Sequence, residues 1–169
     1  MPLSRYVFAD LNALNDDVRA HMQGRSRQYS QEELALPFPL DPYKLTELLS
    51  SPGGEMKVFL LQPEYERRDL LSSCWLGFTT KEYPRTYSLE NLLKRNLAED
   101  ANGVLGAGKK TLVLVGGELT SSILDRVKLY FTAGWSVQFY CFRERGSEVS
   151  DRLHAKYPRH FQSVYLGEN

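Results

Sequence analysis

The stretch Thr111-Leu112-Val113-Leu114-Val115, followed by Gly116-Gly117-Glu118, decides the fold class of this chain. An earlier stretch has the same form, because Tyr6-Val7-Phe8-Ala9 ends at Asp10. Nearly continuous apolar runs are typical of strands whose two faces are both covered, as in the parallel sheets of α/β proteins. We therefore predict one three-layer α/β domain over residues 1–169, with a mainly parallel central sheet of five or six strands and helices on both faces.

Strand-like and helix-like segments alternate along the rest of the chain. Leu11, Leu14, Val18 and Met22 lie on one face of a helix, and Ser88 stands before another helical pattern. A polar and proline-rich segment over 23–40 is predicted to be a loop, and Leu70 and Leu71 suggest a charged helix. Strands are predicted at 5–9, 56–61, 75–83, 111–115, 135–142 and 161–166, and helices at 11–22, about 45–49, 89–99, about 123–131 and about 149–157.

Composition excludes some classes of protein. A hydrophobic share of 42% and a charged share of 25% are ordinary for a globular chain, and the formal net charge is zero. A nucleic-acid surface would therefore have to be a local patch. Cys74 and Cys141 have apolar neighbours, which favours buried thiols in a reducing compartment. No apolar stretch has the length of a membrane helix, so we expect no membrane partner and an intracellular location, cytoplasmic or nuclear.

The segment from Gly103 to Thr111 is similar to a phosphate-binding P-loop, but we reject that interpretation. A P-loop needs Ser or Thr directly after its lysine, and Lys110 follows Lys109 here. A P-loop also follows a strand and opens a helix, so that helix amides face the phosphates. These glycines instead follow a predicted helix and precede a predicted strand, which indicates a connecting loop.

Acidic residues at the ends of two predicted strands are the better candidates for a site. Asp10, with Asn12 close behind, ends the first strand, and Glu118 follows the strand at 111–115. Ligands of open α/β sheets bind beyond the carboxyl ends of the strands, and Mg²⁺ prefers one or two carboxylates together with water. Asp10 is alternatively a cap of the helix that begins near Leu11, which is the commoner role of such a residue. Glu99 and Asp100 are predicted to lie on a solvated helix face.

Several of these segments together resemble a known family. The stretch from Thr111 to Glu118, the helix after it, the strand around Val137 and the helical segment 147–153 are similar, in this order, to the C-terminal half of an NYN domain, a PIN-like ribonuclease fold. Asp10 with Asn12 resembles the opening Asp-Gly-x-Asn segment of that family, and Glu90 resembles its central acidic position. The resemblance implies a site in which Asp10, Glu90 and Glu118 hold Mg or Mn for hydrolysis of RNA, while Asn12 and Thr120 orient ligands or water.

The departures from the family pattern concern the same site. Leu11 stands where a glycine is usual, and Glu90 and Glu118 replace aspartates, while Thr120 replaces another. Glutamate is one methylene longer, which moves a metal ligand by more than the ~0.5 Å that a preorganised site tolerates. The resemblance therefore implies a weakened or inactive nuclease that acts in RNA metabolism by binding RNA or a protein. The alternative is an active Mg- or Mn-dependent endoribonuclease that cleaves single-stranded RNA.

Basic residues and one loop are the candidate binding surfaces. Arginine beside aromatic residues can contact the phosphates and bases of single-stranded RNA, although a solvated helix face is the commoner explanation of such a pattern. The loop at 23–42, with Tyr29 and Phe38, is the candidate surface for a protein partner, and a homodimer is also open. The predicted RNA-binding residues are Arg143, Arg145, Arg152 and Lys156.

Overall fold

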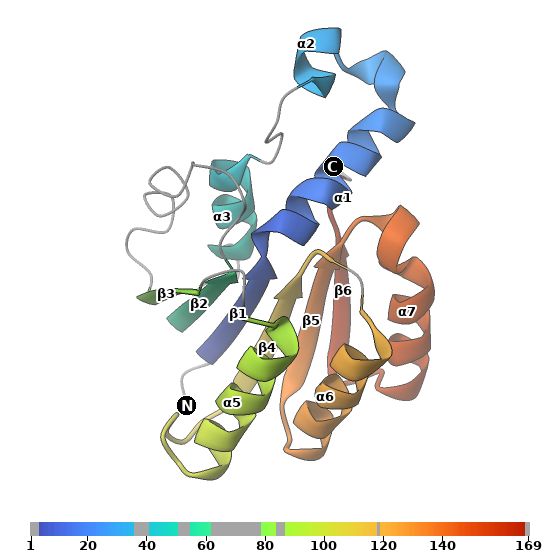
Figure 1. Ribbon diagram of the computed structural model, residues 1–169. Helices are drawn as coiled ribbons and strands as arrows, with labels where there is room; N and C mark the ends of the chain where they lie inside the picture. Colours follow the sequence, from blue (N-terminus) through green and yellow to red (C-terminus); the bar gives the residue numbers. More distant parts are fainter. Residues whose placement is uncertain are drawn as a thin grey trace.

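The computed structural model describes residues 4–35, 41–50, 55–61, 79–83, 87–117 and 119–167 (Figure 1). Within them six strands form one sheet in the order β3-β2-β1-β4-β5-β6, and every neighbouring pair is parallel. The predicted α/β fold with a parallel sheet is confirmed. The strands are β1 (Ser4–Asp10), β2 (Glu55–Leu61), β3 (Thr79–Tyr83), β4 (Lys110–Val115), β5 (Ser136–Cys141) and β6 (Phe161–Tyr165).

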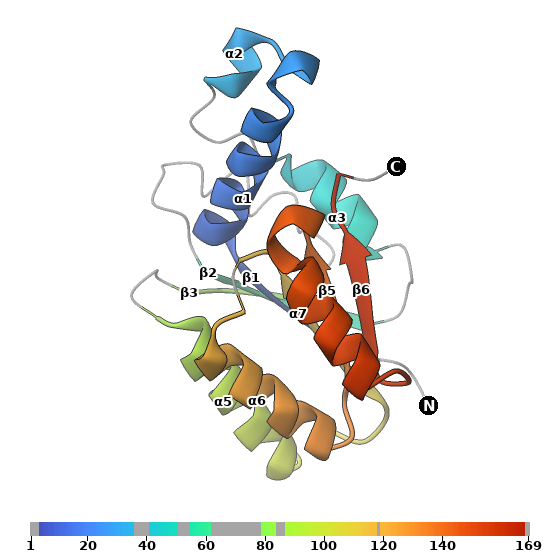
Figure 2. The ribbon, with the colours of Figure 1, turned by 90° about the vertical axis from the view of Figure 1, so that its right-hand side faces the viewer.

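Helices cover both faces of this sheet, as the sequence predicts (Figures 1 and 2). The cluster on one face includes residues of α1 and α3, and the cluster on the other face includes residues of α5, α6 and α7. No helix within the described ranges is long and apolar enough to cross a bilayer. The helices are α1 (Leu11–Gly24), the 3₁₀ turn η1 (Ser26–Gln28), α2 (Gln31–Leu34), α3 (Pro42–Ser50), α5 (Leu89–Ala101), α6 (Ser121–Thr132) and α7 (Arg143–Lys156).

The prediction of a loop over 23–40 is wrong in part. Residues 26–28 form a 3₁₀ turn, and residues 31–34 form a short helix. The start of this helix is stabilised by a capping box, in which the side chains of Ser30 and Glu33 each accept a hydrogen bond from the other's backbone N–H. Residues 36–40 lie outside the described residues. So do residues 62–78, where the helix around Leu70, the residue Cys74 and the start of the predicted strand 75–83 fall.

The apolar run of β1 is explained by its place at the centre of the sheet. Val7 is paired with Val58 on one side and with Val113 on the other. Successive side chains of a strand point to opposite faces, so Val7 belongs to the cluster under α1 and α3 while Tyr6 and Phe8 belong to the cluster under the other helices. Both faces of β1 are buried, which explains why the residues from Tyr6 to Ala9 are all apolar.

Helix α1 runs across the carboxyl edge of the sheet. Leu14 lies so close to Gly116 that a Cβ added to Gly116 would come within 2.6 Å of Cδ1 of Leu14. Further along α1, the ring of His21 lies 4.6 Å from the ring of Phe142 and next to Gly167. These contacts follow β4, β5 and β6 in turn, and Figure 1 shows α1 above the ends of these strands. The carboxyl ends of β4 to β6 are therefore covered.

A buried arginine joins β1 to α3 and β5. Arg5 is 1% exposed, and its guanidinium donates to the carbonyl oxygen of Leu49 near the end of α3. Its second terminal nitrogen donates to Gln138 Oε1 at 3.3 Å and to the hydroxyl of Tyr140 at 3.2 Å. A carbonyl near a helix C-terminus carries partial negative charge, which stabilises a cation there. Arg5 thus holds α3 against the sheet.

Candidate functional site

Asp10 ends β1 and caps α1. Its Oδ1 accepts hydrogen bonds from the backbone N–H groups of Asn12 and Ala13, both at 3.1 Å. The expectation that Asp10 is a helix cap is confirmed. Because the first amides of α1 already face a carboxylate, this helix end does not offer the amide cradle that binds phosphate in nucleotide-binding loops.

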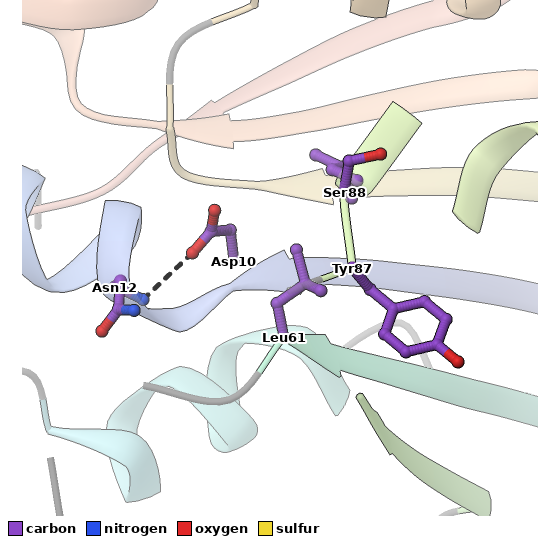
Figure 3. Close-up of a pocket in the computed structure, with 6 residues that line it drawn as sticks. Asp10, Asn12, Leu61, Tyr87 and Ser88 are labelled. Atoms are coloured by element: carbon purple, nitrogen blue, oxygen red, sulfur yellow. Dashed lines mark hydrogen bonds between the residues drawn. The ribbon is translucent and has the colours of Figure 1, made fainter. Parts of the chain in front are cut away.

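A pocket opens beside Asp10 and Asn12. Its volume is about 340 Å³, and it lies at the carboxyl ends of β1 and β2 and the start of α5 (Figure 3). Ser88 caps α5, because its Oγ accepts a hydrogen bond from the N–H of Asn91 at 3.1 Å. This part of the edge is not covered by the contacts that α1 makes over β4 to β6. The pocket is lined by Asp10, Asn12, Leu61, Tyr87, Ser88 and Leu89.

A series of aromatic rings leads from the core to this pocket. The rings of Phe8 and Phe59 are stacked with centroids 4.5 Å apart, and the ring of Tyr83 follows at 6.5 Å from Phe59. Tyr87 lies 5.4 Å from Tyr83 and is 47% exposed. In Figure 3 the ring of Tyr87 points away from Asp10. Tyr87 therefore lines the pocket as a residue whose ring is backed by packed aromatic rings, while Asp10 and its neighbours form a separate, polar side.

Of the other described residues of the predicted metal site, Asn12 lines this pocket, whereas Glu90 and Thr120 do not. The carboxylate of Glu90 lies 3.8 Å from Nε of Arg126 on α6. Thr120 caps α6 by accepting from the N–H of Ile123 at 3.4 Å. Glu118 lies outside the described residues. In the part of the chain that the structure describes, no three His, Cys, Asp or Glu residues are placed to hold a metal ion together. A Mg or Mn site at Asp10, Glu90 and Glu118 stays a prediction.

Asp17 is a buried carboxylate at this edge that sequence reasoning missed. It accepts a hydrogen bond from the N–H of Gly117 at 2.7 Å and lies 3.6 Å from Nε of Arg145. Burial is the main cause that raises the pKa of Asp17, helped by Asp16 and Asp10, against the opposing effects of Gly117 and Arg145. Spacings of seven residues from Asp10 and three from Leu14 put Asp17 on the inward face of α1, which is the signal that could have identified it.

His21 forms a second contact between α1 and the start of α7. Its Nδ1 lies 2.9 Å from Oε1 of Glu144, and Arg25 lies 3.9 Å from the same oxygen. Burial raises the pKa of Glu144, but its own backbone N–H together with His21 and Arg25 outweighs burial, and the pKa is lowered. With Asp17 and Arg145, these side chains bind α1 to α7 over the carboxyl edge.

The four predicted RNA-binding residues share α7 but do not form one cluster. Arg145 faces Asp17, and the guanidinium of Arg143 lies 4.0 Å from the ring centroid of Tyr165. Arg152 is nine residues beyond Arg143, which is about 14 Å along a helix. Lys156 is further still, with its Nζ 5.6 Å from the ring of Tyr157. The first two residues therefore lie near the carboxyl edge and the last two toward the opposite end of α7.

The prediction that Asp100 lies on a solvated face is wrong. Its carboxylate accepts from Nε1 of Trp135 at 2.8 Å and lies 2.8 Å from Nζ of Lys110, and the side chain is only 15% exposed. The partners come from the segments that open β4 and β5, so the position of Asp100 on α5 alone could not reveal them. The glycine segment after α5 precedes β4, which agrees with our rejection of a P-loop.

No protein-family model, curated protein or solved structure matches this chain. Its strand order is that of doubly wound dinucleotide-binding sheets, but such a fold hosts many functions. The glycine-rich turn of those proteins is absent here, because Leu11 opens α1 directly after Asp10. The function must therefore be inferred from the pocket and its residues.

Proposed function

We propose that this chain is a PIN-like module of the NYN type, with weakened or absent catalysis, that binds single-stranded RNA. The observation that carries the proposal is the pocket at the carboxyl ends of β1 and β2, which is lined by Asp10 and by Tyr87, a side chain that is 47% exposed. Proteins that bind single-stranded RNA stack unpaired bases on aromatic rings and bond the base edges and 2′-hydroxyls. A volume of about 340 Å³ suits one nucleoside.

The charge of the pocket favours a nucleoside over a phosphate at this position. Asp10 supplies a carboxylate, which repels an anion but accepts hydrogen bonds from a ribose hydroxyl or a base N–H. Ser88 adds a hydroxyl, and Leu61 and Leu89 also line the pocket, where they would contact the apolar edge of a bound ring. The flanking phosphates would then lie outside the pocket.

Three carboxylates that already have protein partners support the proposal of weak catalysis. Asp10 accepts from two backbone amides, Glu90 lies beside Arg126, and Asp17 is held by Gly117 and Arg145. A divalent ion binding to any of them would have to compete with these partners. The replacement of aspartate by Glu90 and Glu118 and of an acid by Thr120 acts in the same direction.

The binding part of the proposal is tested by fluorescence anisotropy with a labelled single-stranded oligoribonucleotide at fixed salt. Loss of one base–aromatic stack costs about 1–3 kcal/mol, so Tyr87→Ala should weaken binding by about 5- to 150-fold. Tyr43→Ala is the matched control, because Tyr43 is also exposed, at 59%, but lies on α3 away from the pocket. Equal affinity of Tyr87→Ala and wild type, or no RNA binding by the wild type, would contradict the proposal.

The catalytic part needs a separate measurement. The wild type should leave the same RNA intact, or cleave it only slowly, in the presence of Mn²⁺. Asp10→Asn keeps a capping side chain and removes the charge. Efficient Mn²⁺-dependent cleavage by the wild type that disappears in Asp10→Asn would show the active endoribonuclease instead.

A further inference from the structure

Strand β6 is the last strand at one edge of the described sheet, and one side of its backbone faces no other strand that the structure describes. Within the described residues its only neighbour is β5, and in Figure 2 the edge of β6 faces the viewer with α7 beside it. The sequence of β6, Phe161-Gln162-Ser163-Val164-Tyr165, contains neither a charged residue nor a proline. Charges, prolines and bulges are the usual protection of an edge strand against pairing with another chain. This edge lacks the first two.

The hydrogen bonds between β5 and β6 show which backbone groups point outward. The N–H of Val137 donates to the carbonyl of His160, and the N–H of Leu166 donates to the carbonyl of Cys141, both at 2.8 Å. In a parallel ladder, the N–H and C=O of alternate residues point to the same neighbouring strand. Gln162 and Val164 therefore face β5, and the groups of Ser163 face away from it.

The outward groups match those of a second copy of the same strand. We propose that two copies of this chain pair through antiparallel β6 strands, with the two-fold axis at Ser163. In that register the N–H of Ser163 donates to the carbonyl of Ser163 in the other copy, and the reverse. The N–H of Tyr165 donates to the carbonyl of Phe161 of the other copy. The N–H of Phe161 is not required, and it already bonds the carbonyl of Tyr157 at 3.0 Å.

The side chains allow this pairing. Ser163 would stand opposite its own copy, where two small neutral side chains neither clash nor repel, and Gln162 would stand opposite Val164. Helix α7 contacts both β5 and β6. Each α7 would lie over the last two strands of its own sheet, on the same face as its copy. Because neighbouring strands lie about 4.8 Å apart, the two helices would lie about 10 Å apart. Packed helices have this spacing, so the helices would add contact area to the strands.

The first test is the molar mass of the full chain, measured by light scattering over a range of concentration. Wild type should approach twice the 19.4 kDa of one chain as concentration rises. Ser163→Lys and Ser163→Glu each place like charges opposite one another, which should raise the dissociation constant of the dimer about fivefold or more. A mixture of these two variants should recover the dimer, and this recovery also shows that both variants are folded. Gln162→Lys is the matched control and should keep the dimer, because its lysine would face Val164.

The second test is amide hydrogen exchange of single residues of the wild type at low and high concentration. Gln162 and Val164 should be protected at both concentrations, whereas Ser163 and Tyr165 should become protected only as the dimer forms. A wild type that remains monomeric at every concentration overturns the proposal. So does a dimer that Ser163→Lys leaves intact, or one in which exchange at Ser163 does not slow.

Discussion

The carboxylate of Asp17 and the backbone N–H of Gly117 are joined by a 2.7 Å hydrogen bond that ties α1 to the turn after β4. The bond lies at the carboxyl edge of the sheet, just beyond the end of β4. Because Asp17 is 4% exposed, its side chain replaces water as the partner of Gly117. The position of α1 over the edge therefore depends in part on one buried acceptor.

Removing this acceptor should destabilise the fold more than removing its charge. Asp17→Ala leaves the N–H of Gly117 without its partner, and we expect a loss of about 1–3 kcal/mol in the free energy of unfolding. Asp17→Asn keeps an oxygen that can accept the same bond and should cost less. Urea denaturation at neutral pH measures both values. Equal losses in the two variants would mean that the ion pair with Arg145, rather than the hydrogen bond, stabilises this contact.

The pKa of Asp17 predicts a dependence of stability on pH. Burial, the largest cause, raises the pKa in the folded chain above the ordinary 3.8, so the folded state holds this proton more tightly than the unfolded state. The contribution of Asp17 to stability is therefore fully present below pH 3.8 and is lost as the pH rises through the folded pKa. Asp17→Asn lacks this loss. The free energy of unfolding of Asp17→Asn minus that of wild type should therefore rise from pH 3.8 to the folded pKa and then become constant. A difference that falls with pH would refute a raised pKa of Asp17.

The contact between α1 and β4 can be tested at Gly116. Gly116 has φ of 68°, and an added Cβ would meet Cδ1 of Leu14 at 2.6 Å. Gly116→Ala should therefore lose about 1–2 kcal/mol from backbone strain and a further 1–3 kcal/mol, roughly, from overpacking. Gly106→Ala is the matched control, because Gly106 has φ of 78° and no atom within 4 Å of its added Cβ. Thermal or urea unfolding measures the loss of stability in both variants. Similar losses would show that α1 can move away from the added Cβ at little cost in free energy.

Asp100 offers a test of a contact that its place on α5 does not reveal. Asp100→Ala removes the acceptor of the indole N–H of Trp135, which is 2% exposed, so we expect a loss of about 1–3 kcal/mol. Glu99→Ala, one residue earlier, removes only a partly exposed pair with Arg95 at 3.4 Å and should cost about 0.5 kcal/mol or less. If urea denaturation gives the same small loss for both, the bond to Trp135 contributes nothing to stability.

The sequence predicts the elements of this fold better than their arrangement. The runs at Tyr6 and Leu112 are strands because both faces of each are buried, and that burial is visible as an unbroken apolar pattern. The order of the strands has no comparable local signal. The sequence does not predict the contacts of Asp17 and His21, because α1 crosses the edge of the sheet. There its inward face meets polar groups of the turn after β4 and of α7. A purely apolar inward face is expected only where a helix packs flat on a sheet.

The central position of β1 has a consequence during synthesis. Val7 pairs with Val58 and with Val113, so its second partner is made about 100 residues after it. At about 5–20 residues per second, this strand waits on the order of 5–20 s on the ribosome for β4. Throughout that interval one side of an apolar strand has unpaired backbone groups, which can join other nascent chains. The yield of native protein will therefore depend on how well the growing chain is shielded until residue 115 has emerged.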